Sequence, residues 1–270
     1  MKRLGHIATR RQLFRAMALG TASVPFALAK KSAAMGFFPG PWRPDPGQPG
    51  PVPSGPHCLL KGTKISTPSG DRPVQELQIG DAVHTLAGPK AIKWIGYDKF
   101  TKEEGKTWLD SVMPIRVARF AFDDYSPRSD LYLSPLHCVF FNEALMPVKY
   151  LMNGTSIAQG TPSDMSAIEY YHIDLDTHEV LYAEGALVES FFDGYSEREY
   201  FSNFIEYERL YGTERQPKMT PFAPILGYRN RRAKIEGVAR SLISNIVDVR
   251  DPVQIAHDQI ARRVATLPAY

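Results

Sequence analysis

Short runs of alternating or β-branched residues dominate the middle of the chain, from Thr63 to about Phe192. An alternation of apolar and polar residues indicates half-buried strands, and turn residues separate these runs at short intervals. The predicted strands are Lys64–Thr67, Ala82–Leu86, Ala91–Ile95, Ile115–Phe120, Leu131–Ser134, Cys138–Phe141 and Glu179–Ala183. We therefore expect this part of the chain to be a mainly β, compact all-β body.

The pattern changes after Gly194 to the spacing of amphipathic helices. Ser196 and Glu199 have the spacing of a capping box, and Asp251 followed by Pro252 suits the start of another helix. Three apolar stripes follow the helical period: Tyr200, Phe201, Phe204, Tyr207 and Leu210; Ile235, Val238, Ala239, Leu242, Ile243 and Ile246; Val253, Ala256, Ile260, Val264 and Leu267. Residues 196–270 are thus predicted to be a helical C-terminal extension. Its basic run at 229–234 is interpreted as a solvated helix face, with a binding patch as the alternative.

The first part of the chain has the pattern of an export signal rather than of a folded domain. Arg10 and Arg11 lie in a segment that resembles a twin-arginine signal, and a weakly apolar run ends in Ala27-Leu28-Ala29. Residues 1–36 are interpreted as signal and leader, which predicts a periplasmic or secreted protein. The alternative is a basic N-terminal helix on a cytoplasmic protein. Gly20 and Pro25 interrupt the run, so we expect no stable membrane anchor.

A Pro/Gly-rich segment precedes the strands. Phe37 to Pro56 contains twelve Pro or Gly among twenty residues. Such a composition has too little apolar surface to fold, so residues 37–57 are predicted to be an extended linker. The folded body is then expected to begin at Cys58.

Composition narrows the classes of protein. The 270 residues are 43% hydrophobic and 23% charged, enough for a sizeable core in one large or two small domains. A net charge of +3 is too small to indicate nucleic-acid binding. The two cysteines exclude a disulfide scaffold and allow at most one bridge, Cys58–Cys138.

Cys58 is the candidate nucleophile because of its place in the sequence. A nucleophile on the first residue of a folded body has one carbonyl next to it, that of His57, so the expected substrate is the protein's own backbone. Converting a peptide bond to a thioester requires proton delivery to the amide nitrogen and an activated thiol, whose ordinary pKa is about 8.5. The imidazole of His57 either has a role in the cleavage or is incidental to it.

Three segments together resemble a known family. They are the pattern Gly62-Thr63-x-Ile65-x-Thr67-Pro68-x-Gly70 with its continuation to Gly80-Asp81-x-Val83-x-Thr85, the segment Leu133–His137, and the segment Tyr171–Phe191. They are similar to the Hint domain, the self-processing module of hedgehog proteins and inteins, and most of all to bacterial stand-alone Hint proteins. The resemblance covers about 58–195 and implies a horseshoe-like all-β autoprocessing domain.

The resemblance also implies roles for individual residues. Cys58 lies at the family's nucleophile, and Ser134-x-x-His137 fits its Thr/Ser-x-x-His motif. The histidine of that motif polarises the scissile amide, and its hydroxyl helps to hold it. His172 lies near an acidic position of many inteins, where it can tune proton transfer or be a polar residue of a strand surface. His178 or Glu179 lies near another polar position and has the same two interpretations.

The last segment departs from the inteins. Splicing ends with an asparagine, usually after a histidine, and the chain has Glu189 and Ser190 there. Neither can cyclise to release a downstream segment, so protein splicing is not expected. Ser190 lies where hedgehog domains have a cysteine, and its hydroxyl either assists acyl transfer or is a plain turn residue. Hint folding further implies that Gly185 to Phe191 returns beside the Cys58 strand.

The leading hypothesis is a single-turnover autoprotease that acts on itself. An N-to-S acyl shift at His57–Cys58 gives a thioester, which water or another small nucleophile then resolves; no cofactor is expected, and the acceptor is not written in the sequence. The alternative is a non-catalytic Hint-like module that binds a partner through its helical tail. A cysteine hydrolase acting in trans is a further possibility.

A metal site is the last alternative. His57, Cys58, His137 and Cys138 are ligand types that suit zinc. Adjacent strand residues point to opposite faces, so this spacing opposes a metal site and predicts that Cys138 faces the core if His137 faces Cys58.

Overall fold

The structure, a computed structural model, describes residues 56–102, 104–162, 165–212, 217–226 and 252–265. Every described residue belongs to one compact unit of the chain, Pro41–Tyr270. Its strands are β1 (Leu59–Leu60), β2 (Lys64–Thr67), β3 (Gly70–Pro73), β4 (Ala82–Thr85), β5 (Gly88–Ala91), β6 (Trp94–Thr101), β7 (Ile115–Val117), β8 (Leu131–Leu133), β9 (Cys138–Phe141), β10 (Ala144–Pro147), β11 (Ile157–Gln159), β12 (Ala167–Asp174), β13 (Val180–Ala183) and β14 (Ala186–Glu189). Three 3₁₀ turns, η2 (Val74–Glu76), η3 (Val148–Leu151) and η4 (Arg198–Tyr200), and two helices, α1 (Phe204–Tyr211) and α3 (Pro252–Val264), complete the described elements.

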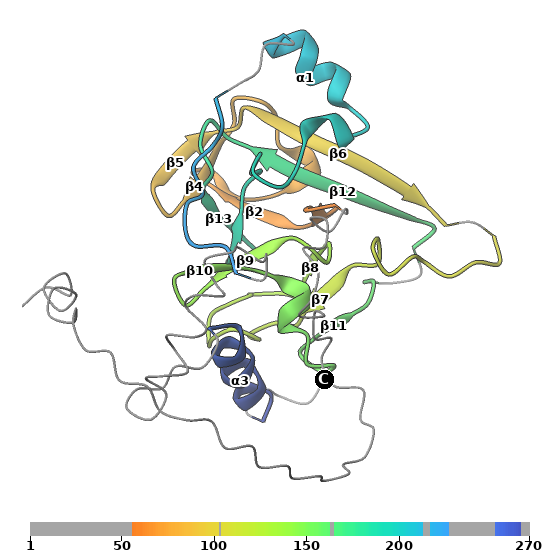
Figure 1. Ribbon diagram of the computed structural model, residues 1–270, viewed down its shortest axis with the longest axis vertical. Helices are drawn as coiled ribbons and strands as arrows, with labels where there is room; N and C mark the ends of the chain where they lie inside the picture. Colours follow the sequence, from red (N-terminus) through yellow and green to blue (C-terminus); the bar gives the residue numbers. More distant parts are fainter. Residues whose placement is uncertain (1–55, 103, 163–164, 213–216, 227–251, 266–270) are drawn as a thin grey trace, which may run out of the picture. The chain divides into compact units, whose positions relative to one another are not determined.

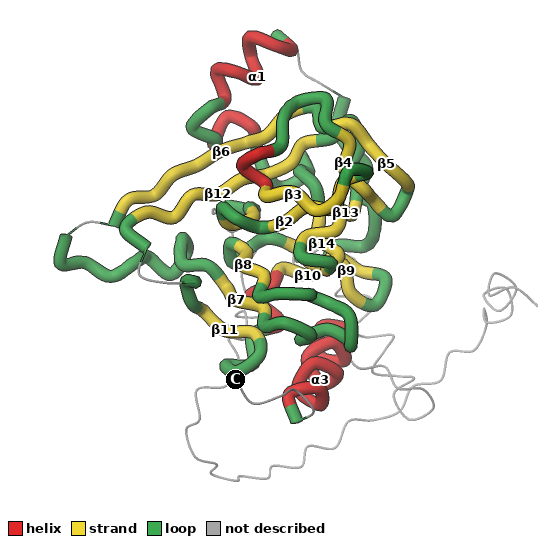
Figure 2. Tube along the Cα trace, turned by 180° about the vertical axis from the view of Figure 1, so that it is seen from behind, coloured by secondary structure: helices red, strands yellow, loops and turns green. Residues whose placement is uncertain are grey.

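Two antiparallel sheets form the body, so the prediction of a mainly β domain with a helical C-terminal part is confirmed. The first sheet has the order β11-β7-β8-β1-β12-β6, in which β6 and β12 run side by side along their whole length (Figures 1 and 2). The second has the order β10-β9-β14-β13-β2-β3, with β4 paired to β13 and β5. The short strand β1 thus lies inside the first sheet, between β8 and β12.

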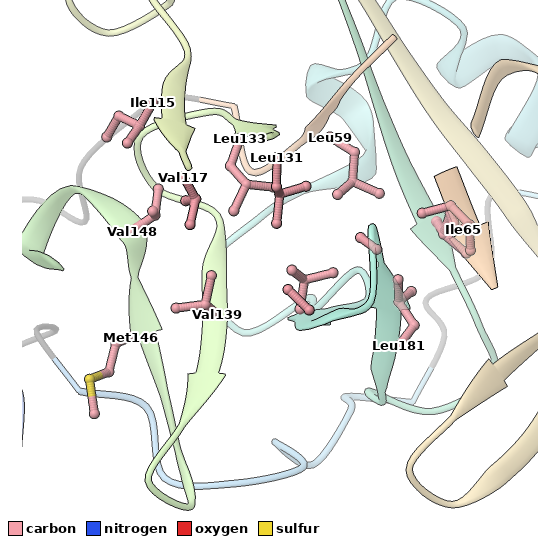
Figure 3. Close-up of a cluster of buried hydrophobic side chains, with 14 of the residues drawn as sticks. Leu59, Ile65, Ile115, Val117, Leu131, Leu133, Val139, Met146, Val148 and Leu181 are labelled. Atoms are coloured by element: carbon pink, nitrogen blue, oxygen red, sulfur yellow. The ribbon is translucent and has the colours of Figure 1, made fainter. Parts of the chain in front are cut away.

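Apolar side chains from both sheets share one core (Figure 3). Leu59 of β1 and Leu133 of β8 come from the first sheet, and Ile65, Val139 and Leu181 come from the second. Because successive strand residues point to opposite faces, Cys58 and Leu60 face away from this core. They belong to a second cluster that is rich in aromatic residues: Trp94, Val112, Ile168, Tyr170, Phe191, Phe201 and Tyr207.

Six of the seven predicted strands are present, and the seventh, Ala91–Ile95, is wrong. β5 ends at Ala91 and β6 begins at Trp94. At the break the N–H of Ile92 donates to Asp81 O and that of Lys93 donates to Asp174 O. The chain changes from one sheet to the other here, so a continuous apolar run contains two strand ends.

The expected return of Gly185–Phe191 beside the Cys58 strand is also wrong. β14 pairs with β13 and β9, whereas β12 and β8 flank β1. The segment reaches the first sheet only after β14 ends, where the N–H of Phe191 donates to Ile173 O. The side chain of Glu189 nevertheless lies close to His57, as described below.

The first predicted helix begins later than its capping box indicates. α1 starts at Phe204, after Asn203, because the preceding residues bond to the free edge of β6: Ser202 N donates to Tyr97 O, and Asn203 Oδ1 accepts from Tyr97 N. Two residues of the predicted stripe, Tyr200 and Leu210, are exposed.

The later helix agrees with its pattern. α3 begins at Pro252, and Ala256 and Ile260 of its predicted stripe are buried in the main core. The middle predicted helix and the basic run at 229–234 lie outside the described residues. Neither described helix has the length and apolar character that crossing a lipid bilayer requires.

Candidate active site

Cys58 lies at the entry to β1 and is fully buried. The pairing of β1 with β8 continues one step beyond β8, because Ser134 N donates to Cys58 O at 2.9 Å. This register places the turn after β8 directly against the peptide bond between His57 and Cys58. That turn carries both residues of the Ser134-x-x-His137 motif.

The Ser134 hydroxyl contacts the predicted scissile peptide directly. Its Oγ accepts the Cys58 N–H at 2.6 Å and donates to Pro56 O at 2.6 Å. The Cys58 nitrogen is the atom that would become the departing amine. One buried hydroxyl therefore holds the chain on both sides of His57, by accepting from one backbone group and donating to another.

His137 lies close to the same peptide. Its ring is fully buried beside the backbone of His57, and this contact favours the charged imidazole, as an accepting carbonyl does. Neither ring nitrogen of His137 has a partner at hydrogen-bond distance and angle among the described residues. Burial lowers the pKa of His137 to about 4, although the negative charge of Glu189 acts in the opposite direction. The ring is therefore neutral at pH 7, beside the carbonyl but not locked to it.

The thiol of Cys58 is protonated at neutral pH. Burial and the nearby charge of Asp98 raise its pKa well above the ordinary value, and a hydrogen bond from the His57 backbone offsets this in part. Asp98 is half-buried on β6, and its carboxylate accepts from Ser202 Oγ at 2.7 Å. Before any reaction, the Cys58 thiol is thus protonated and the His137 imidazole is neutral.

His172 packs against His137. It projects from β12, is buried, and its ring centre lies 5.3 Å from that of His137. Burial lowers its pKa well below the usual value. Its interpretation as a residue of a strand surface is wrong, since the ring packs between His137 and Phe191.

Ser190 is buried just after β14 and is not at an exposed turn. Its Oγ accepts the N–H of Glu179 at 2.9 Å, and its own N–H donates to Glu179 O at 2.9 Å. This pair of bonds extends the β13–β14 ladder. The backbone of Ser190 also favours the charged form of the His172 ring, so the segment contacts the histidine layer through its main chain.

Glu189 is the residue that sequence reasoning did not assign to the site. Its carboxylate is fully buried, 3.7 Å from His57 Nδ1 and 3.8 Å from His178 Nε2. Its Oε1 accepts the N–H of Cys138 at 2.7 Å, and its Oε2 accepts the hydroxyl of Tyr195. Glutamate is rarely buried in a core. A glutamate at the end of an apolar strand pattern is therefore the only signal in the sequence that could have assigned Glu189 to the site.

Cys138 follows His137 but belongs to another environment. It packs with Leu145 and Val180 in a small apolar cluster, as the alternation of strand residues predicts. Both cysteines are free thiols, so the Cys58–Cys138 bridge is not present. In the part of the chain that the structure describes, no three His, Cys, Asp or Glu side chains are arranged to hold a metal ion.

Comparisons with known proteins agree with this description. The family model of the Hint domain matches residues 57–195, about half of the chain. The chain therefore belongs to the Hint domain family, a family of self-processing modules. No curated protein is similar to it in sequence.

Several solved structures are similar to the chain at low identity. The gp41-1 intein is 15% identical and covers 48% of this chain and 96% of its own, with a TM-score of 0.34. The Msm DnaB1 intein splicing domain, bound with zinc, is 16% identical and covers 49% and 98%, with a TM-score of 0.35. A bacterial intein-like domain from Clostridium thermocellum is 7% identical and covers 50% and 98%, with a TM-score of 0.29. Identities this low transfer no residue's role.

Proposed function

We propose that this Hint domain cleaves its own backbone between His57 and Cys58 through a thioester, without splicing. The main support is the placement of the Ser134 hydroxyl on the Cys58 N–H at 2.6 Å, with the His137 ring close to the backbone of His57. The Ser134 hydroxyl contacts the nitrogen of the scissile peptide bond, and the His137 ring lies beside its carbonyl. The nitrogen must gain a proton, and the carbonyl must be polarised.

The first step is an N-to-S acyl shift. Cys58 Sγ bonds to the carbonyl carbon of His57, the carbon–nitrogen bond breaks, and the proton of the thiol ends on the nitrogen. Because the pKa of Cys58 is raised and that of His137 is lowered to about 4, the thiol and not the imidazole supplies this proton. The Ser134 hydroxyl, which accepts the Cys58 N–H, keeps the nitrogen in place to receive this proton, while the neutral His137 ring donates a hydrogen bond to the carbonyl oxygen.

The second step resolves the thioester. Water or another small nucleophile bonds to the His57 carbonyl carbon, the carbon–sulfur bond breaks, the proton of the nucleophile ends on sulfur, and the segment that ends at His57 is released. Because Cys58 is fully buried, water reaches the thioester slowly. A small nucleophile that is stronger than water is expected to react faster once it enters the site. Glu189 and Ser190 leave no asparagine to cyclise, so a downstream segment is not released. We further propose that residues 1–36 direct export, which would release the product outside the cytoplasm.

The decisive experiment follows the size of a fusion protein. A reporter replaces residues 1–36, and cleavage is followed on denaturing gels with and without hydroxylamine. Wild type is expected to release the reporter with its linker, faster with hydroxylamine, and the remaining fragment begins at Cys58. Cys58→Ala is expected to stay intact, whereas Cys138→Ala, the matched buried cysteine, cleaves normally.

Two outcomes would overturn the proposal. Prompt cleavage of Cys58→Ala would show that the thiol is not the nucleophile. A wild-type fusion that stays intact in hydroxylamine would favour the non-catalytic module, whose partner would then be sought at the C-terminal extension.

A further inference from the structure

The side chain of His57 occupies a defined subsite in the protein interior. Its ring stacks on Tyr195, with ring centres 4.6 Å apart and planes inclined by 27°, and the residue is only 2% exposed. The Nδ1 atom of the ring lies 3.7 Å from Glu189 Oε1. The cleavage chemistry itself uses only the backbone of this residue, so a built environment for its side chain has another purpose.

Glu189 is a charged partner for that ring. Burial acts to raise the pKa of Glu189, but the hydrogen bond with His57 and the nearby rings of His137, His57 and His178 outweigh it, so the pKa is lowered. The carboxylate is therefore ionised at neutral pH in a fully buried position. A buried charge of this kind is tolerated because several donors surround it.

The same carboxylate also reaches the catalytic turn. Its Oε1 accepts the N–H of Cys138, the residue that directly follows His137. The Tyr195 hydroxyl donates to its other oxygen, which ties the stacking face of the subsite to the same group. One carboxylate thus links the side chain of residue 57, the aromatic ring that covers it and the backbone that carries His137.

We propose that Glu189 and Tyr195 form a subsite that recognises the side chain of residue 57, so that the histidine before Cys58 is a specificity determinant of cleavage. This inference rests on the proposed cleavage at His57–Cys58. Glu189 acts as a positioning residue: when the ring of His57 is in place, the scissile carbonyl and the His137 turn are held by the same group. A side chain that cannot bond to Glu189 leaves the peptide misplaced.

The test compares residue preference in two backgrounds of the full-length fusion. His57→Phe keeps the stacking on Tyr195 but loses the contact between the ring nitrogen and the Glu189 carboxylate, so cleavage in hydroxylamine is expected to slow on the order of tenfold. In Glu189→Gln the carboxylate is gone, and adding His57→Phe to this background is expected to leave the reduced rate unchanged. A general loss of stability would slow cleavage with either residue at position 57 and leave the ratio of the two rates as it was, and that result would overturn the inference.

Glu184→Gln is the matched control. Glu184 is another buried glutamate that accepts a backbone N–H, that of Lys64 at 2.7 Å, but it lies at the β13–β14 turn and does not contact residue 57 in the described structure. This variant is expected to keep the full preference for histidine. If it loses the preference as Glu189→Gln does, the effect belongs to folding and the subsite is refuted.

A second measurement does not depend on cleavage. In the full-length Cys58→Ala protein, ¹⁵N NMR reports which ring nitrogen of His57 carries the proton. We expect Glu189→Gln to change the His57 ring signals and Glu184→Gln to leave them unchanged. Unchanged signals in Glu189→Gln would overturn the subsite. If wild type does not cleave but these signals respond, the cleavage proposal fails while the docking of His57 stands.

Discussion

The two cysteines are alike in their oxidation state, their burial and the direction in which their pKa is shifted. Cys58 and Cys138 are both free, both fully buried, and burial raises the pKa of each well above the ordinary value. They differ in what holds the peptide N–H. A serine hydroxyl accepts that of Cys58, whereas the Glu189 carboxylate accepts that of Cys138 inside a strand ladder. Reactivity is thus expected to depend on the peptide bond before the cysteine and not on the acidity of the thiol.

Replacing each sulfur by oxygen is the strongest test of this comparison. Cys58→Ser keeps the size of the side chain but makes it far less acidic, so cleavage is expected to slow by about a thousandfold or more. Cys138→Ser is expected to cleave at the normal rate and to unfold more easily, by about 1–3 kcal/mol, because it places a hydroxyl in an apolar cluster. Cleavage rates of the fusion and urea unfolding measure the two effects. If both substitutions slow cleavage equally, the expected difference in reactivity between Cys58 and Cys138 is refuted.

The next largest effect is expected at His137. His137→Gln keeps a hydrogen-bond donor but loses the imidazole beside the scissile carbonyl, and we expect cleavage to slow by about a hundredfold. His84→Gln is the control, since that ring bonds to Ser66 on the second sheet, away from Cys58. Thioester formation, measured by trapping with hydroxylamine, separates this step from hydrolysis. A rate within about twofold of wild type would refute the role, since general acid–base groups contribute far more than that.

A smaller effect is expected at Ser134, the contact that distinguishes the two cysteines. Ser134→Ala leaves the Cys58 N–H and Pro56 O without their common partner, and cleavage is expected to fall on the order of tenfold to a hundredfold. Ser134→Thr keeps the hydroxyl and is expected to retain most of the rate. If alanine and threonine behave alike, the hydroxyl is not the relevant group.

The smallest effect concerns stability and pH. Burial lowers the pKa of His137 to about 4 and that of His172 well below its ordinary value, whereas the unfolded chain titrates near 6.5. Between these pH values the unfolded state binds more protons, so stability is present above about pH 6.5 and is lost as the pH falls toward 4.

The free energy of unfolding is expected to change with pH by up to about 1.4 kcal/mol per pH unit for each ring. Urea unfolding of Cys58→Ala, which does not cleave, measures it at several pH values. Adding His172→Gln is expected to lower by about one the number of protons taken up on unfolding, and so to reduce the slope. An unchanged slope would mean that the ring is charged in the folded protein.

The local pattern of the sequence was enough for most of the strands. Lys64–Thr67 alternates and Cys138–Phe141 is a short apolar run, and the observed bounds of both match the prediction. β1 and β11 are too short for an alternation to be recognised, and Ala91–Ile95 reads as one strand although the chain changes sheets within it. Which sheet a strand joins depends on distant partners, and a local pattern does not encode them.

The candidate site divides in the same way. Cys58, Ser134 and His137 were predicted because their spacing along the chain carries the motif, and the structure brings them together at one peptide bond. Glu189 was set aside as a residue unable to splice. Its role depends on contacts with His57, Cys138 and Tyr195, which come from three separate segments.

The sequence by itself determined the β character of the body and the residue types of the Cys58 and Ser134-x-x-His137 motifs, because each depends on neighbours along the chain. Only the tertiary structure decided that β12, and not the Gly185–Phe191 segment, lies beside the Cys58 strand. It alone also placed the Glu189 carboxylate on the ring of His57. The physical reason is that strand pairing and a buried charge are satisfied across space, by groups that no spacing in the sequence connects.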